Sequence, residues 1–121
     1  MASVREATAA DRAAVVRMGR EFHKHAGVPT EFDPVYASAV VSSFITDTDK
    51  LCLVLDNGSV SGALLAHASQ SPIGPFTSAM EVMWWIEPDV RGSSAVRMLT
   101  AYEHWARGKG CLLIGVAALA G

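Results

Sequence analysis

Charge and cysteine are both scarce in this chain. Of its 121 residues, 18% are charged, two are cysteines, and the formal net charge is −2. A balance this close to neutral gives no electrostatic basis for binding nucleic acid. Cys52 and Cys111 both lie in apolar, strand-like runs. They are therefore expected to be buried free thiols of a reduced, cytoplasmic protein rather than a disulfide framework.

Signals for secretion or membrane insertion are also lacking. Charged residues occur within the first twelve positions, so no signal peptide is indicated. Residues 57–80 contain no Asp, Glu, Lys or Arg, but Pro72, Gly74 and Pro75 interrupt them, which argues against a membrane span. The length suits a single domain over residues 1–121, and 50% hydrophobic residues favour a sheet covered on both faces.

Hydrophobic periodicity and turn residues predict the order β-α-α-β-β-β-α-β. Val15, Met18 and Phe22 recur at helical spacing after a capping-box pattern at residues 8–11, and Asp33-Pro34 is a typical helix start. Asp56-Asn57-Gly58 predicts a hairpin turn. The expected strands are one beginning at Val4, then Lys50–Leu55, Val60–Ala68, Glu81–Ile86 and a fully buried strand Cys111–Ala117; the expected helices are 9–25, 34–46 and Ser93–Lys109.

Residues 80–111 carry the most informative pattern. A buried strand is stopped by Pro88, and a small-residue loop then opens a helix. Such a junction directs backbone N–H groups to one point, which suits a pyrophosphate. Ile86-Glu-Pro88, Arg91-Gly92-Ser-Ser-Ala-Val96 and Glu103-x-Trp-Ala-x-Gly-x-Gly-Cys111 resemble the acetyl-CoA-binding segment of the GNAT superfamily of N-acetyltransferases.

The resemblance implies an α/β GNAT-like fold, with a mixed central sheet flanked by helices. It also implies an enzyme that transfers acetyl from acetyl-CoA to a primary amine by direct attack in a ternary complex, without a metal. The cofactor-binding residues that it implies are Trp84, Trp85, Ile86, Arg91, Gly92, Ser93, Ser94, Ala95 and Val96. Ser94 and Val96 replace the small glycine or alanine that the family pattern has there. The alternatives are a plain helix cap made by the serines and core packing for at least one tryptophan.

Glu81 is the candidate general base. In many GNAT enzymes a glutamate at this place takes a proton from the substrate ammonium, directly or through water. A partly desolvated carboxylate suits that role because burial raises its pKa. The competing interpretation is that Glu81 marks an exposed strand end.

The histidines give no metal site. His23 and His25 are two residues apart and so do not share a helical face. His67 either lines the substrate cleft or is a satisfied strand histidine. Glu31 and Asp33 are candidates to shape the acceptor site; they favour a cationic acceptor or simply form a solvated loop.

Family members usually continue past the last expected strand with a helix and two more strands. We therefore expect this chain to lack that C-terminal part, and the sheet edge to be open. An open edge favours a homodimer or another partner covering it. The rival function is a non-catalytic GNAT-fold interaction module.

Overall fold

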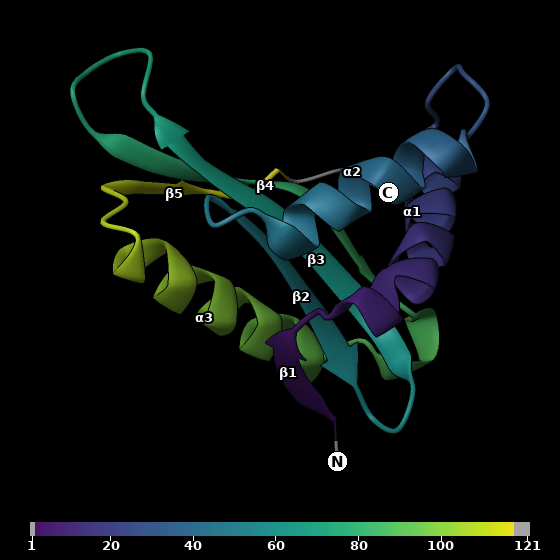
Figure 1. The fold of residues 1–121 in the computed structure, drawn as a ribbon. Helices are drawn as coiled ribbons and strands as arrows, with labels where there is room; N and C mark the ends of the chain where they lie inside the picture. The colour runs from purple at the N-terminus through teal and green to yellow at the C-terminus, as the bar shows by residue number, and fades with distance from the viewer. Residues whose placement is uncertain (1, 118–121) are drawn as a thin grey trace.

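The computed structural model describes residues 2–117, and its elements follow the predicted order (Figure 1). Two short 3-10 turns precede the first and third α-helices. The α/β architecture predicted from the sequence is confirmed. The bounds are β1 Ser3–Glu6, η1 Ala9–Asp11, α1 Arg12–Ala26, α2 Pro34–Thr46, β2 Lys50–Asp56, β3 Val60–Gln70, β4 Thr77–Ile86, η2 Pro88–Val90, α3 Ser93–Gly108 and β5 Leu113–Gly115.

The five strands form one mixed sheet in the order β1-β2-β3-β4-β5. Neighbours from β1 to β4 are antiparallel, and β5 runs parallel to β4 after the α3 crossover. The predicted hairpin turn joins β2 to β3. Gly58 adopts φ 106 there, and its N–H donates to the Asp56 carboxylate at 2.9 Å.

Helices cover both faces of the sheet (Figure 1). Helix α3 packs on one face through Met98, Tyr102 and Ala106. Helices α1 and α2 pack on the other face, where Met18 and Phe44 are buried. Alternation along the strands divides the core accordingly, and Leu64 and Leu65 belong to different layers. Within residues 2–117, none of the helices combines the length and apolarity needed to cross a bilayer.

The strand predictions were wrong at two places. Strand β4 begins at Thr77 rather than Glu81, because its first residues pair with the end of β3 through Ser69–Ser78 and Gln70–Thr77. Small polar residues can join a strand through backbone pairing alone, without an apolar pattern.

The last strand was predicted as Cys111–Ala117 and fully buried. Strand β5 spans only Leu113–Gly115 in the structure, and Leu113 is 51% exposed. Its pairing is limited to Ser78–Met80 of β4. A short strand at the edge of the described sheet buries less of its side chains than a central strand does.

The N-terminal segment is held by two ion pairs of Arg5. Arg5 on β1 contacts Asp11 at 2.8 Å and Asp56 at 3.1 Å. Asp11 also accepts from the N–H of Thr8 at 2.7 Å. Its pKa is lowered to about 2, chiefly by the hydrogen bond from Arg5.

We expect the Asp11 carboxylate to stabilise the fold in a pH-dependent way. A lowered pKa contributes stability above the unfolded value of about 3.9, and that stability is lost as pH falls toward 2. Asp11→Asn should therefore cost about 1–2 kcal/mol at pH 7 and progressively less below pH 4, since Arg5 is partly exposed. Urea unfolding of the wild-type and variant proteins at pH 7 and at a pH below 4 measures this difference. An equal cost at the two pH values would contradict the prediction.

Candidate functional site

Strand β4 carries a β-bulge at Val82. Leu65 pairs with Met83, whereas its neighbour Ala66 pairs with Glu81, so Val82 is the extra residue. A bulge interrupts the alternation of side chains. Val82 and Met83 both line a pocket beneath α1 and α2, whereas the strand residues before and after the bulge alternate normally.

Strands β4 and β5 are paired only at the start of β4. Beyond Met80, residues 81–86 have no strand neighbour on that edge within the described part of the chain. The side chain of Tyr102 lies fully buried beneath the sheet, and its hydroxyl donates to the Gly115 carbonyl at 2.7 Å. Burial, and then nearby Glu81, raises the pKa of Tyr102 to about 12, so the hydroxyl keeps its proton. It thus holds the last residue of β5 where the two strands separate.

Tyr102→Phe should loosen β5 selectively. The change removes the hydroxyl and leaves the Gly115 carbonyl without that donor, which costs about 1–2 kcal/mol. Urea unfolding would measure the loss, and amide exchange should quicken first at residues 113–115. Unchanged exchange in β5 would show that Tyr102 only packs.

Glu81 lies in the middle of β4 rather than at an exposed strand end, so that alternative from the sequence is wrong. It is only 3% exposed. It shares the α3 face with Ala79, two residues earlier. Burial raises the pKa of Glu81, and the backbone N–H of Ala117 partly offsets this. The carboxyl group is thus shifted toward the pH range in which a general base works.

Helix α3 begins without a side-chain cap. Gly92 occupies the cap position with φ 117 and ψ −125, and neither Ser93 nor Ser94 caps the helix. The interpretation of these serines as a plain cap is therefore not what the structure shows. One amide expected to be free is engaged, because the N–H of Ala95 donates to the Gly92 carbonyl at 3.0 Å. Ser93 and Ser94 remain at the first turn, where N–H groups have no intrahelical partner.

Five of the predicted cofactor residues line one cavity of about 260 Å³ beside this helix start: Trp84, Trp85, Ile86, Arg91 and Ala95. The Arg91 Nε donates to the Ile86 carbonyl at 2.8 Å, and its guanidinium lies 4.9 Å from the Trp85 ring. Both tryptophan indole N–H groups are buried without a partner among the described residues.

The other predicted residues, Gly92, Ser93, Ser94 and Val96, do not line this cavity. Ser94 is buried, and its hydroxyl accepts from Arg97 at 3.4 Å. Val96 is 65% exposed. Gly92 is the N-cap residue of α3, and Ser93, Ser94 and Val96 follow it in the helix.

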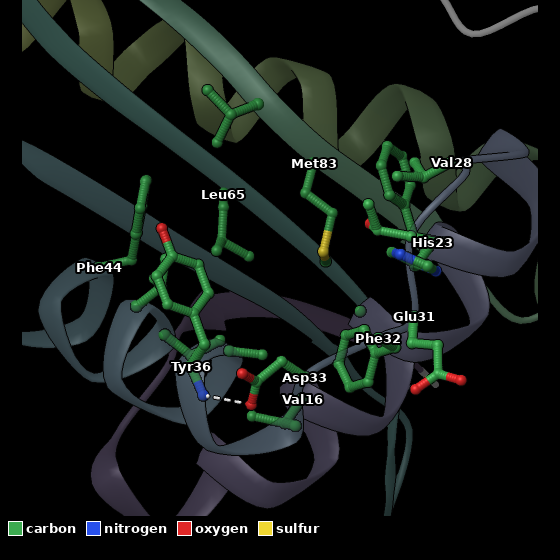
Figure 2. A pocket seen from close by; sticks show the side chains of 17 residues that line it. Val16, His23, Val28, Glu31, Phe32, Asp33, Tyr36, Phe44, Leu65 and Met83 are labelled. Atoms are coloured by element: carbon green, nitrogen blue, oxygen red, sulfur yellow. Dashed lines mark hydrogen bonds between the residues drawn. The ribbon is translucent and has the colours of Figure 1, made fainter.

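A larger pocket of about 570 Å³ lies between α1, α2 and the sheet (Figure 2). Its polar groups come from both ends of the α1–α2 connection, and its floor comes from β3 and β4. Of its lining residues, Glu31 and Asp33 were predicted from the sequence as candidates to shape the acceptor site. The aromatic and sulfur-containing wall was not predicted, although apolar residues inside the α1–α2 connection were a signal for it. The main lining side chains are Val16, Phe22, His23, Val28, Glu31, Phe32, Asp33, Tyr36, Val40, Phe44, Leu65, Val82 and Met83.

The histidines do not gather at one place, and only His23 lines the α1–α2 pocket. The ring centroids of His23 and Phe32 lie 5.6 Å apart, and those of His25 and Trp85 lie 4.8 Å apart. The two imidazoles therefore have different neighbours. His67 pairs with Lys50 and Met80 in the sheet and does not line the α1–α2 pocket. Within residues 2–117, no cluster of three or more His, Cys, Asp or Glu side chains is placed to hold a metal ion.

Solved structures resemble this fold along nearly its full length. A predicted acetyltransferase with acetyl-CoA from Clostridium acetobutylicum gives a TM-score of 0.84 at 15% identity, covering 98% of this chain and 82% of that one. A GNAT family acetyltransferase from Staphylococcus aureus gives 0.73 at 13% identity, covering 97% and 86%. A transcriptional regulator from Bacillus halodurans gives 0.76 at 20% identity, covering 98% and 82%.

No family model matches the sequence. The search of curated proteins also found no match. The similarity is therefore one of fold, and the chain has the GNAT acetyltransferase fold.

Proposed function

We propose that this protein is an N-acetyltransferase that transfers an acetyl group from acetyl-CoA to a primary amine. The observation that carries the proposal is the unpaired edge of β4. The strand bulges at Val82, has no β5 partner beyond Met80 in the described residues, and leads to the uncapped start of α3. A fold shared with acetyltransferases supports the proposal.

The residues present fit acetyl-CoA. The first-turn amides of Ser93 and Ser94, at the positive end of the α3 dipole, would hold the pyrophosphate. The backbone edge around Trp84, which has no strand partner in the described residues, would pair with the amides of the pantetheine arm; at Ile86 the carbonyl already accepts from Arg91. Trp84 and Trp85 both line the adjoining cavity, and their indole N–H groups are buried without a partner among the described residues. The two side chains pack on opposite faces of β4, Trp84 with the α3 cluster and Trp85 with the α1–α2 cluster, so whichever indole N–H reaches the cavity would be a further donor to a ligand there.

Acetyl-CoA supplies the activated acetyl group. The amine nitrogen would form a bond to the acetyl carbon while the carbon–sulfur bond breaks, and the second proton that the nitrogen loses on becoming an amide would end on the departing sulfur, giving a thiol. The substrate ammonium must first lose a proton to become a nucleophile. Glu81 lies beside the bulge but is not among the residues that line the α1–α2 pocket, so it would take that proton through an intervening water rather than directly.

Calorimetric titration with acetyl-CoA tests this function. We expect a dissociation constant below the millimolar range, with weaker binding after Arg91→Ala, because Arg91 lines the cavity. Arg17→Ala, an exposed change on α1, is the matched control. Absence of binding up to millimolar acetyl-CoA would refute the enzyme proposal for this chain.

A non-catalytic interaction module is the second candidate. The observation that favours it is the engagement of Arg91 with the Ile86 carbonyl and the Trp85 ring, which leaves less of its guanidinium for a phosphate. Acetyl-CoA binding without transfer to any amine would support this candidate.

A further inference from the structure

We propose that the α1–α2 pocket binds a primary amine with one bulky aryl or branched-alkyl body, and that His23 accepts a hydrogen bond from its nitrogen. The inference rests on the proposed function, since it names the class of the acetyl acceptor. It is argued from the walls of the pocket, its polar atoms and its charges.

Carbon and sulfur atoms make most of the pocket wall. Phe22, Phe32 and Phe44 contribute three aromatic rings, and Met83 projects from β4 into the centre (Figure 2). A volume of about 570 Å³ lies in the range of small-molecule sites, whose walls are mostly apolar with few polar groups. Such walls gain free energy by removing an apolar ligand body from water.

His23 provides a polar atom that lacks a partner inside this wall. Its Nε2 is buried and makes no hydrogen bond within the described residues, while its ring meets Phe32 edge-on at 5.6 Å. A buried polar atom without a partner costs free energy that a ligand can recover by bonding to it. In the tautomer with its proton on Nδ1, the imidazole accepts from an amine N–H.

The charges at the pocket favour a single positive group. The acidic Glu31 and Asp33 are among its lining residues, whereas no lysine or arginine is. The cations of Arg20 and Lys50 already lie over two of the wall rings, 5.1 Å from the Phe32 centroid and 5.2 Å from the Phe44 centroid, which disfavours a ligand with several positive charges. Asp33 is partly committed, because one carboxylate oxygen accepts from the amides of Val35 and Tyr36 at 3.0 Å (Figure 2). A polyamine would have to bring several charges against the aromatic wall, which is costly. An arylalkylamine buries its body and presents one nitrogen.

The pocket also touches the place where acetyl transfer is proposed. Val82 and Met83, the two residues at the bulge, belong to its lining. Gly19 of α1 faces the same point, since a Cβ there would lie 3.8 Å from the Met83 sulfur and 3.9 Å from the Phe32 ring. An amine held in this pocket therefore lies against the bulged edge of β4.

Binding of 2-phenylethylamine to the protein without acetyl-CoA tests the inference, with spermidine as the comparison ligand. Ligand-observed NMR should show 2-phenylethylamine bound at least tenfold more tightly than spermidine. Gly19→Leu should weaken 2-phenylethylamine binding at least tenfold by filling the pocket. Gly108→Leu is the matched control, because a Cβ at this helical glycine meets nothing within 4 Å. Tighter binding of spermidine, or full affinity in a folded Gly19→Leu variant, would overturn the proposal.

His23→Phe tests the polar contact separately, and it decides the outcome if Gly19→Leu fails to fold. The ring contact with Phe32 is kept, but the acceptor is lost. We expect about tenfold weaker binding of 2-phenylethylamine and unchanged binding of toluene, which has no nitrogen; equal losses for both would refute the hydrogen bond. Because acetyl-CoA is absent, failure here leaves the acetyl-CoA titration unaffected, and failure of that titration leaves this test intact.

Discussion

Glu81→Gln should lower kcat by at least about 100-fold and leave the dissociation constant of acetyl-CoA within about twofold of the wild-type value. Glutamine has nearly the shape of glutamate but cannot take a proton from the amine. The carboxylate lies on β4 beside the bulge, whereas the proposed pyrophosphate site is at the start of α3. Loss of the base should therefore slow acetyl transfer without weakening the binding of acetyl-CoA.

The same substitution should raise the stability of the fold at neutral pH. Glu81 is 3% exposed, and burial raises its pKa, so ionising this carboxyl group costs the folded protein stability. A raised carboxyl pKa means that wild-type stability increases as pH falls through the folded pKa toward the unfolded one. The stability that Glu81→Gln gains over the wild-type protein should accordingly be smaller near pH 4 than at pH 7. Thermal unfolding of both proteins at pH 7 and pH 4 measures this difference.

Glu103→Gln is the matched control for both readouts. Glu103 lies on α3, and its ion-pair partner within residues 2–117 is the exposed Arg107, at 3.7 Å. It should change neither turnover nor the pH dependence of stability. Unchanged turnover in Glu81→Gln would remove Glu81 from the mechanism, whatever its effect on stability.

The order of elements could be predicted because each one carries a local signal. Asp33-Pro34 begins α2, and the Asp33 side chain accepts from two first-turn amides, as a capping residue does. The turn at Gly58 adopts the positive φ that the sequence indicated. The start of β4 and the limits of β5 were not predictable in this way, because pairing across the sheet decides them.

The candidate site was also predictable only where local sequence builds it. The cavity beside α3 is built mainly by a continuous segment, so Trp84, Trp85 and Arg91 could be grouped from sequence alone. The environment of Glu81 depends on the bulge at Val82, which depends on the pairing partner and leaves no mark in the local pattern. The sequence indicated only that His23 lies near the end of a helix. Its Nε2 is buried because residues of the α1–α2 connection, distant from it in the local pattern, line the same pocket.

Gly92→Ala should weaken acetyl-CoA binding at least tenfold. Gly92 has φ 117, a conformation that alanine adopts only at a cost of about 1–3 kcal/mol. The local backbone relaxes to relieve that strain, and the relaxation rotates the peptide groups that lead into Ser93 and Ser94. If their N–H groups hold the pyrophosphate, their displacement removes hydrogen bonds that depend on direction.

Gly58→Ala separates this effect from strain alone. Gly58 also has a positive φ, 106, and a Cβ at either glycine meets nothing within 4 Å. Both variants should therefore lose similar stability in urea unfolding, but Gly58 lies in the β2–β3 turn, so its replacement should leave acetyl-CoA binding unchanged. Calorimetry on the two variants at one temperature makes the comparison. Equal affinities in both would show that the start of α3 does not hold the pyrophosphate, and would move the proposed site to the cavity of Trp84 and Trp85 alone.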